Sequence, residues 1–543
     1  MPPRITLPPS RAALAVIAAV FILPGLAGHD LWKTQDAIGL GIVHGMALSG
    51  DLIVPRIAGE RWLYDEPLYH WVALAFGKLL GSLIEFHAAA RLASGAFVGA
   101  SFLLIYRAAR HWSEAELRRT TACGAFLLLL GCVGLLVHAH EALPELASLA
   151  AMCGALAALP FAAREPAGAG AVFGLALGLA FLAAGAMAPL ALALAVVAAH
   201  LVCAEWRTRR GAVFLGSAAL VAVLVALAWP LALAARAPDA FAEWRAIVTE
   251  REGTVGENLR HVFATASWFT WPAWPLALWS AWSLRKRWRE ARLFVPAVAV
   301  LGMTVLLIAW GPPADENLLP LLAPLSLFAA HGIFTLRRGA AAALDWFGTL
   351  IFGVFAAGVW LGYIAMLTGL PGPVARNFAR IAPGFVMHAH LLAILFAFLL
   401  AAAWVYLVFY SAPSPLRSLA RWAGGMVLLW GTFSALWMPW VDYQKSYRSV
   451  ALQLKSKLPV GAPCLAERNL GVSQAAALDY HGGIRARAYD VVKPAACPLV
   501  LVQGNPQHEL DAPAGAGLRW RKLADVGRPG DRAERYRLYR LER

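Results

Sequence analysis

The sequence predicts an α-helical polytopic membrane protein of about 13 transmembrane helices, followed by a small C-terminal α/β domain. Of its 543 residues, 60% are hydrophobic and only 15% are charged. The mean hydropathy is +0.61, and these values together exclude an ordinary globular chain and a disordered one. Charge density rises after residue 441, which separates a membrane domain of residues 1–440 from a soluble domain of residues 441–543.

The first apolar run, residues 12–28, follows Arg4 and Arg11 and lacks a small-residue cleavage site. We therefore expect a retained helix with a cytoplasmic N-terminus. Later basic clusters lie between apolar runs and should mark cytoplasmic turns: residues 107–119, 164, 207–210, 285–292, 337–338 and 417–421. Because these clusters account for the net charge of +15, we expect no nucleic-acid partner.

Two basic clusters that both face the cytoplasm must be separated by an even number of membrane spans, and this constrains the topology. If residues 68–83 formed a full span, the cluster at 107–119 would face outside, so this stretch is expected to be a partly immersed interfacial helix. About thirteen spans then fit, and three segments lie outside: residues 29–87, residues 236–266 and the tail from 441. This arrangement predicts a multi-pass protein of the bacterial inner membrane with a periplasmic C-terminal domain.

The first external loop, residues 29–87, concentrates acidic side chains beside the membrane: Asp30, Asp36, Asp51, Asp65 and Glu66. Ionisable groups at this depth lose hydration and are usually retained for a substrate, an ion or a proton. Thr34 is the expected N-cap of an amphipathic surface helix over residues 35–48, with Asp36 in its first turn. There the helix dipole favours the ionised carboxylate. Asp36 then serves either as an acceptor for substrate or only as a helix cap.

The tail reads as helix, turn, helix and strand, at residues 447–458, 459–463, 471–480 and 498–503. Two of the six cysteines, Cys464 and Cys497, lie in it, and the other four lie within apolar spans. An oxidising periplasm allows a disulfide between the two tail cysteines. The alternative is two buried free thiols.

The second external loop, residues 236–266, carries mixed charge that is typical of a solvated helical face, and Arg251, Arg260 and His261 are its candidates for contact with an acceptor. A divalent metal is conceivable near the outer end of the third span, where His138, His140, Glu141 and Glu145 lie. Histidines at span ends are more often interfacial anchors, and this spacing is not diagnostic. The sequence therefore assigns no cofactor.

The first loop carries a series of short motifs that begins at Trp32 and continues through Ser49-Gly50-Asp51, Ile53-Val54-Pro55, Ala58-Gly59-Glu60 and Pro67-Leu68-Tyr69-His70-Trp71. In this order, the motifs resemble the first periplasmic loop of the aminoarabinose transferase and protein O-mannosyltransferase superfamily of GT-C glycosyltransferases. Further matches follow in order at Gly174-Leu175-Ala176, Gly185, the tryptophan-rich run 268–279 and Leu318-Leu319-Pro320-Leu321-Leu322. The resemblance covers nearly the whole chain and implies a GT-C fold.

The resemblance also implies sugar transfer from a polyprenyl-phosphate carrier to a glycolipid such as lipid A, or to a protein, at the outer membrane face. Such a reaction needs a carboxylate to orient or deprotonate the nucleophile and cations to hold the phosphate. Asp36 is the first choice for the carboxylate and Asp30 the second. The candidate cations are Arg56, Arg61 and Lys78, each of which could instead contact membrane lipid headgroups.

Four positions depart from the family pattern. The family has an acidic pair in this loop, and here Gln35 and Asp36 stand in its place. Its Glu-Lys-Pro-Pro becomes Tyr64-Asp65-Glu66-Pro67, which exchanges a lysine for a carboxylate. A Thr-Asp becomes Pro144-Glu145, and the lysine of a Lys-Gly-Pro turn becomes Ala184. The donor site is then less cationic than expected, and Asp65, Glu66 and Glu145 become candidate substrate contacts.

Two other classes remain open. A non-catalytic or divergent membrane paralogue would explain the missing acid and lysines. A lipid-linked glycan transporter would require internal repeats and a through-path, and the hydropathy shows no clear repeat.

Overall fold

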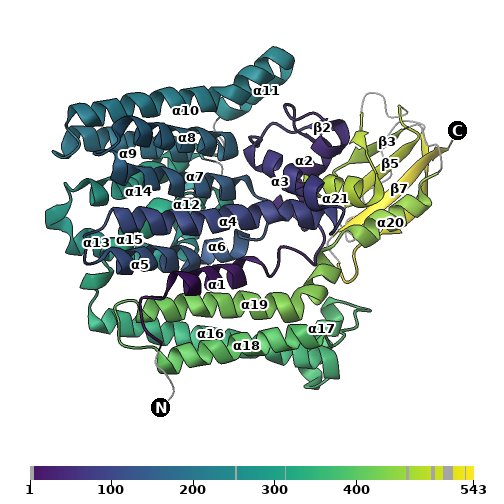
Figure 1. The fold of residues 1–543 in the computed structure, drawn as a ribbon. Coiled ribbons are helices and arrows are strands. Elements are labelled where there is room, and N and C mark those ends of the chain that lie inside the picture. Colours follow the sequence, from purple (N-terminus) through teal and green to yellow (C-terminus); the bar gives the residue numbers. More distant parts are fainter. Residues whose placement is uncertain are drawn as a thin grey trace.

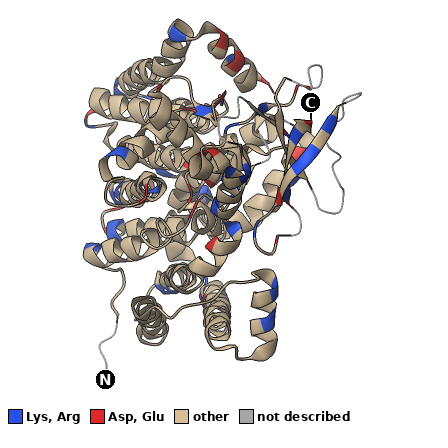
Figure 2. Ribbon diagram, turned by 90° about the vertical axis from the view of Figure 1, so that its right-hand side faces the viewer, with Lys and Arg blue, Asp and Glu red and all other residues tan. Residues whose placement is uncertain are grey.

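The computed structural model describes residues 5–250, 253–311, 314–459, 464–490, 496–504, 518–531 and 534–542. Helices form one large bundle, and a smaller domain with a β-sheet lies at the end of it (Figure 1). Figure 2 shows that charged residues are sparse along the bundle and frequent on the smaller domain. The α-helical membrane fold with a small C-terminal α/β domain is therefore confirmed.

The bundle helices are α1 (Arg11–Ile22), α4 (Phe86–His111), α5 (Arg118–Gly131), α6 (Val133–His138), α7 (Pro144–Ala158), α8 (Pro166–Ala184), α9 (Met187–Val202), α10 (Arg209–Arg236), α13 (Ala273–Ser283), α14 (Ala291–Trp310), α15 (Leu322–His331), α16 (Arg338–Thr368), α18 (Leu391–Tyr410) and α19 (Arg417–Lys445). Short 3-10 turns η1 (Leu159–Phe161), η2 (Arg285–Arg287), η3 (Asp315–Leu318) and η4 (Ile333–Thr335) adjoin them. Within the described residues, seven helices are long and apolar enough to cross a membrane. The chain is a multi-pass membrane protein, and the count of thirteen spans stays a prediction.

Small residues bring the bundle helices close together. On α8, Gly170 and Gly174 face α10, and a Cβ on Gly174 would lie 2.2 Å from the carbonyl oxygen of Ala218. Backbones that approach so closely are typical of helix packing in membranes, where the apolar effect does not distinguish lipid from protein. The outer surface is left apolar, as at Leu392 and Phe409 of α18.

The first loop folds into α2 (Gln35–Ser49), a short hairpin of β1 (Arg56–Ile57) and β2 (Glu60–Arg61), and α3 (Leu68–Leu80). The predicted helix over residues 35–48 is confirmed, but its amphipathic surface character is wrong. Eight of its residues are buried, because α2 packs between α3 and helix α21 (Val472–Gly482) of the C-terminal domain (Figure 1). Thr34 precedes the helix without a side-chain capping bond. Helix α3 is 13 residues long, and its interfacial position stays a prediction.

The second loop contains α11 (Pro238–Thr249) and α12 (Val255–Phe269), and α12 begins with a capping box of Thr254 and Glu257. A further short helix, α17 (Gly372–Ile381), connects α16 to α18. The sequence analysis places no external segment there. Phe378 of α17 packs against Trp437 and Trp440 of α19, with ring centroids 5.1 and 4.9 Å apart.

The C-terminal domain is a five-stranded sheet in the order β4-β3-β5-β7-β6, with two helices. Its strands are β3 (Leu465–Arg468), β4 (Arg487–Ala488), β5 (Leu499–Gly504), β6 (Arg519–Val526) and β7 (Arg535–Glu542), and its helices are α20 (Arg448–Lys457) and α21 (Val472–Gly482). Strands β4, β3 and β5 run parallel, while β7 is antiparallel to both β5 and β6. The two helices cover one face through Leu454, Leu478, Leu501 and Leu538.

Candidate functional site

Acidic residues of the first loop divide into two groups with opposite surroundings. Asp30 and Asp36, at its start, meet arginines. Asp65 and Glu66, thirty residues later, lie among other carboxylates. The two groups therefore have different chemical capacities.

Asp36 is bound on both oxygens by groups of the protein. Arg91, which is fully buried on α4, donates from Nε to Oδ1 at 2.9 Å and from Nη2 to Oδ2 at 2.7 Å. The backbone N–H groups of Ala142 and Trp32 donate to the same carboxylate at 3.0 and 3.2 Å. Burial raises the pKa of Asp36, but the charge and hydrogen bonds of Arg91 outweigh it and leave the pKa below its ordinary value. Asp36 thus joins α2, α4 and the turn before α7.

Asp30 has a similar role at the other end of this junction. Its carboxylate accepts from Arg448 Nη2 at 2.6 Å and from the Ser446 hydroxyl at 2.5 Å. Its backbone N–H donates to Asp442 Oδ1 at 2.8 Å. Burial raises the pKa of Asp30, but the bonds from Arg448 and Ser446 give a net lowering. Both predicted catalytic carboxylates are therefore held in ion pairs, and Asp30 links the loop to the C-terminal domain.

Asp65 and Glu66 lack such partners. The Trp62 indole donates to Asp65 Oδ2 at 2.6 Å, and burial together with the charge of Glu316 raises the pKa of Asp65. Glu66 is buried, and burial followed by the charge of Asp65 raises its pKa to about 8. A Cβ on Gly185, whose φ is +71°, would lie 3.7 Å from Glu66 Oε1, so the backbone of this turn approaches the carboxylate closely.

Two more carboxylates complete this acidic cluster, which we define as Asp65, Glu66, Glu145 and Glu316. Glu145, in the first turn of α7, interacts electrostatically with the other three, and its Oε2 has no hydrogen-bond partner among the described residues. Glu316 lies on η3 and accepts a bond of 2.5 Å from Gln35 Nε2. Glu316 was not among the residues predicted from the sequence. Its position two residues before the motif Leu318-Leu319-Pro320-Leu321-Leu322 is the signal that could have identified it.

A histidine pair borders the cluster. His138 Nδ1 lies 2.8 Å from Glu141 Oε2, and His261 Nε2 of α12 lies 3.4 Å from Asp315 Oδ1, the neighbour of Glu316. Helices α6 and α12 and the turn η3 contact one another here. One polar site thus gathers side chains from four parts of the chain that are far apart in sequence: the first loop, the α6–α7 segment, α12 and η3.

The predicted cations lie in less direct positions. Arg61 pairs with Asp239 of α11 at 2.6 Å, and Arg56 donates to the carbonyl oxygen of Gly59 at 3.2 Å. Lys78 and Arg260 are exposed and form no ion pair among the described residues. Arg251 lies outside the described residues. Each remains a candidate substrate contact.

Among the described residues, one group of side chains has a spacing that could hold a metal ion: Asp30, Glu85 and His87, whose ligand atoms lie within 4.8 Å of one another. Arg448 already places Nη2 2.6 Å from Asp30 and 3.2 Å from Glu85, so a guanidinium supplies the positive charge there. Of the candidate metal ligands, His140 instead lies 2.9 Å from the carbonyl oxygen of Phe21 and stacks on Trp430. The geometry around His140 thus favours packing over metal binding.

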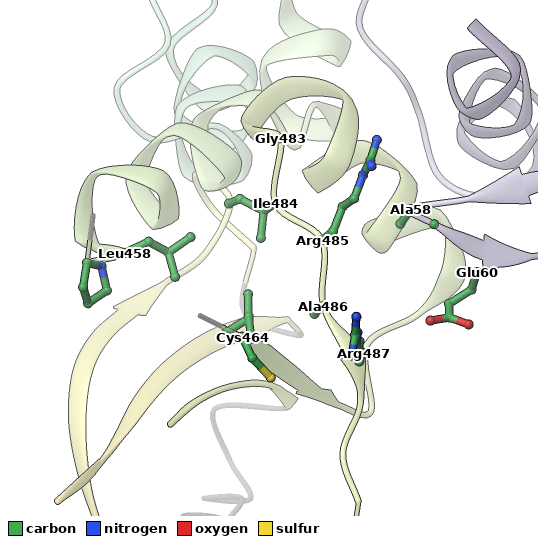
Figure 3. A pocket seen from close by; sticks show the side chains of 12 residues that line it. Ala58, Glu60, Leu458, Cys464, Gly483, Ile484, Arg485, Ala486 and Arg487 are labelled. Atoms are coloured by element: carbon green, nitrogen blue, oxygen red, sulfur yellow. The ribbon is translucent and has the colours of Figure 1, made fainter. Parts of the chain in front are cut away.

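The disulfide between Cys464 and Cys497 is confirmed, with Cα atoms 5.2 Å apart. It joins the start of β3 to the segment before β5. Beside it, a cavity of about 650 Å³ separates the β1–β2 hairpin from the C-terminal domain (Figure 3). Arg485 and Arg487 line it from one side and Glu60 from the other.

Comparisons with known proteins give this geometry a context. No protein-family model matches the chain. It is 30% identical over 335 residues to undecaprenyl phosphate-α-4-amino-4-deoxy-L-arabinose arabinosyl transferase 1 of Sodalis glossinidius, covering 59% of this chain and 58% of the relative. It is 29% identical over 360 residues to the corresponding transferase of Pseudomonas paraeruginosa, covering 63% of each. The chain therefore aligns with about three fifths of the length of these relatives.

The whole fold extends the likeness. The crystal structure of ArnT from Cupriavidus metallidurans bound to undecaprenyl phosphate superposes with a TM-score of 0.68 at 18% identity, covering 97% of this chain and 96% of that one. The chain has the GT-C fold of the aminoarabinose transferases. The resemblance drawn from the loop motifs is thereby confirmed. The role of Gln35, which the loop motifs align with the family's first acid, stays a prediction, and the carboxylate of Glu316 lies against its amide.

Proposed function

We propose that the chain is a membrane glycosyltransferase that moves a sugar from a polyprenyl-phosphate carrier to a glycolipid at the periplasmic face of the bacterial inner membrane. The observation that carries the proposal is the bond between Gln35 and Glu316. The loop motifs align Gln35 with the family's first acid, so a carboxylate bound to Gln35 would compensate for the acid that is missing there. Glu316 is accordingly the proposed base, which orients and deprotonates the attacking hydroxyl group.

Asp36, the residue next to Gln35, is proposed as a positioning residue. Its oxygens already accept four hydrogen bonds, so its remaining capacity to accept a proton from substrate is small. Glu316 accepts a hydrogen bond from Gln35 and is only half-buried. Among the described residues, it is the better placed carboxylate for proton transfer.

The rest of the acidic cluster favours a cationic sugar. Asp65, Glu66 and Glu145 form no ion pair with a basic side chain among the described residues. The similar transferases carry 4-amino-4-deoxy-L-arabinose in their names, and the amino group of such a sugar is protonated at neutral pH. We propose that this ammonium group lies against Asp65 and Glu66. Because the pKa of Glu66 is about 8, donor affinity should rise from pH 6.5 to 8 as the carboxylate ionises.

An apolar groove supports the lipid nature of the donor. It has a volume of about 520 Å³ and runs along α4, α7 and α8, from Leu68 to Arg107. Leu68 is two residues from Glu66, so a carrier chain in this groove would bring its phosphate to the acidic cluster. His261 and Arg260 of α12 are the proposed contacts to that phosphate.

The test is sugar transfer by the purified protein in nanodiscs, with a polyprenyl-phosphate-linked amino sugar and a lipid A acceptor. Glu316→Gln should lower the transfer rate about 100-fold to 10,000-fold. The double variant Glu316→Gln/Gln35→Glu moves the carboxylate to the other end of the same hydrogen bond and should regain activity. Full activity of Glu316→Gln would exclude Glu316 as the base. An inactive wild-type chain that binds donor would favour the non-catalytic paralogue.

The proposed orientation has a separate test. An introduced thiol in Glu60→Cys should react with an impermeant reagent from the periplasm, and one in Lys286→Cys should not. The four free native cysteines are buried, which keeps the background low. Labelling at position 286 would overturn the orientation.

A further inference from the structure

An apolar cavity of about 480 Å³ lies beside the turn η2, between the end of α13 and the start of α14. Helix α13 is at the end of the bundle away from the C-terminal domain (Figure 1). The cavity follows α14 from Leu293 to Val298, a length of about 8 Å. Most of its lining is apolar: Ala281, Leu284, Leu293, Phe294, Ala297, Val298 and Phe328. We call this cavity the lipid slot.

Close packing of α13 on α15 forms the floor of the lipid slot. The Ser280 hydroxyl donates to the carbonyl oxygens of Leu276 and Ala329 at 2.9 and 3.1 Å. A side chain on Gly332, the residue after α15, would clash with this hydroxyl. The one buried polar side chain of the floor is thus satisfied within the protein, so the inner part of the slot suits hydrocarbon rather than a polar ligand.

The rim of the lipid slot is cationic. Five basic residues stand within the eight positions 285–292. Two of them, Arg287 and Arg292, form ion pairs with Glu114 and Glu290. The other three are exposed and form no ion pair among the described residues: Arg285, Lys286 and Arg289. Three positive charges therefore remain uncancelled at the rim.

Indole rings position two of these cations. The Arg285 guanidinium lies 4.4 Å from the centroid of the Trp282 ring and donates to the Trp282 carbonyl oxygen at 2.7 Å. The Arg289 guanidinium lies 5.1 Å from the ring of Trp288, which lines the slot. Both tryptophans are exposed, and exposed tryptophans of membrane proteins are typical of the headgroup level. The two arginines thus lie where a lipid headgroup would meet them.

Helix α14 separates the lipid slot from the acidic cluster. It begins at the rim of the slot and ends shortly before η3, which carries Glu316. Its 20 residues correspond to about 30 Å, the thickness of the hydrocarbon core. A headgroup bound at η2 therefore lies at the opposite membrane face and cannot reach Glu316. The ligand of this slot is not a reacting substrate.

We propose that the lipid slot binds one anionic phospholipid of the leaflet at this face, the cytoplasmic leaflet in the proposed orientation. The phosphodiester lies against Arg285, Lys286 and Arg289, and one acyl chain enters the slot as far as Val298. Charge complementarity selects an anionic lipid over a zwitterionic one, because an ethanolamine ammonium group would meet the same three cations. This inference does not depend on the proposed reaction.

A bound lipid of this kind would stabilise the helices that flank η3. The slot is lined by residues of α13, α14 and α15, and η3 lies between α14 and α15 in the chain. An acyl chain between α13 and α14 fills a space that no side chain of the described residues occupies. The expected role is structural, with an effect on the melting temperature.

The test measures lipid binding by the full chain. The purified protein in detergent is titrated with phosphatidylglycerol or with phosphatidylethanolamine, and native mass spectrometry counts the bound lipid. The wild type should bind one phosphatidylglycerol more tightly than any phosphatidylethanolamine. Arg285→Gln/Arg289→Gln should bind phosphatidylglycerol about 25-fold more weakly, because each cation near a lipid headgroup contributes about five-fold. Arg209→Gln removes an exposed cation from another basic cluster and should bind as the wild type does.

Two further measurements test the apolar part and the fold. Ala297→Leu narrows the slot without changing charge and should also weaken phosphatidylglycerol binding. Added phosphatidylglycerol should raise the melting temperature of the wild type and of Arg209→Gln, and should raise that of Arg285→Gln/Arg289→Gln much less. The melting temperatures without lipid show whether each variant is folded before its binding is compared.

Three outcomes would overturn the inference. The first is wild-type affinity of Arg285→Gln/Arg289→Gln for phosphatidylglycerol. The second is equal affinity of the wild type for the two phospholipids, which would show that the rim does not recognise the headgroup charge. The third is tighter binding of polyprenyl phosphate that the same double variant abolishes, which would assign the slot to the carrier lipid.

Discussion

The first loop carries two pairs of carboxylates about thirty positions apart, Asp30 with Asp36 and Asp65 with Glu66, and their surroundings are opposite. Asp36 is neutralised by a buried arginine at 2.7 Å, whereas Glu66 has only another carboxylate as its nearest charge influence. The first arrangement stabilises the junction of three segments. The second arrangement opposes ionisation, so it persists at a cost in stability and is typical of functional sites. Proximity of a carboxylate to the membrane alone therefore does not identify catalysis.

The largest expected effect on stability comes from breaking the ion pair between Arg91 and Asp36. Arg91→Met leaves the Asp36 carboxylate buried without its charge partner, and should destabilise the protein by about 3–5 kcal/mol. The measurement is the apparent melting temperature in detergent. The double variant Arg91→Met/Asp36→Asn should regain part of the loss, because no unpaired charge remains. An unchanged melting temperature for Arg91→Met would show that this pair does not hold the junction together.

The loop also shows which features of the site were accessible from the sequence. The helix over residues 35–48 and the disulfide of Cys464 with Cys497 follow from local spacing and from the charge of the tail. The partners of Asp36 and Gln35 do not, because Arg91 is 55 residues from Asp36 and Glu316 is 281 residues from Gln35. Those pairings arise from packing of whole helices, and periodicity carries no information about them.

The buried state of α2 has the same origin. Its apolar spacing predicts one covered face, and the structure covers a second face with α21, which begins more than 400 residues later. Gly41 allows this contact, since a Cβ there would lie 2.7 Å from the Cβ of Ala476. The order of the sequence motifs predicted the fold correctly, because that order reflects the arrangement of the whole chain rather than the environment of one helix.

Glu66, which has no basic partner among the described residues, should make the stability of the protein depend on pH. The pKa of Glu66 in the folded protein is about 8, above the ordinary value of 4.5. The folded state therefore holds this proton more tightly than the unfolded state does, so its stabilising contribution is complete below pH 4.5 and is lost as pH rises through 8. We expect the melting temperature of the wild type to fall between pH 6 and 9, and Glu66→Gln to fall less. Identical pH profiles would contradict the raised pKa of Glu66.

The smallest effect is expected at Arg61, whose ion pair with Asp239 joins the β1–β2 hairpin to α11 on the exposed surface. Exposed pairs of this kind contribute little to stability, because water and salt screen their charges. Arg61→Ala and Asp239→Asn should therefore lower the melting temperature slightly and equally, and the double variant should lower it no further.

The same variants decide whether Arg61 also meets the donor phosphate. If it does, Arg61→Ala raises the KM for the polyprenyl-linked sugar and Asp239→Asn does not, because only the first removes the cation. Equal KM values in both variants would assign Arg61 to the junction alone, and would leave α12 as the source of the phosphate contacts.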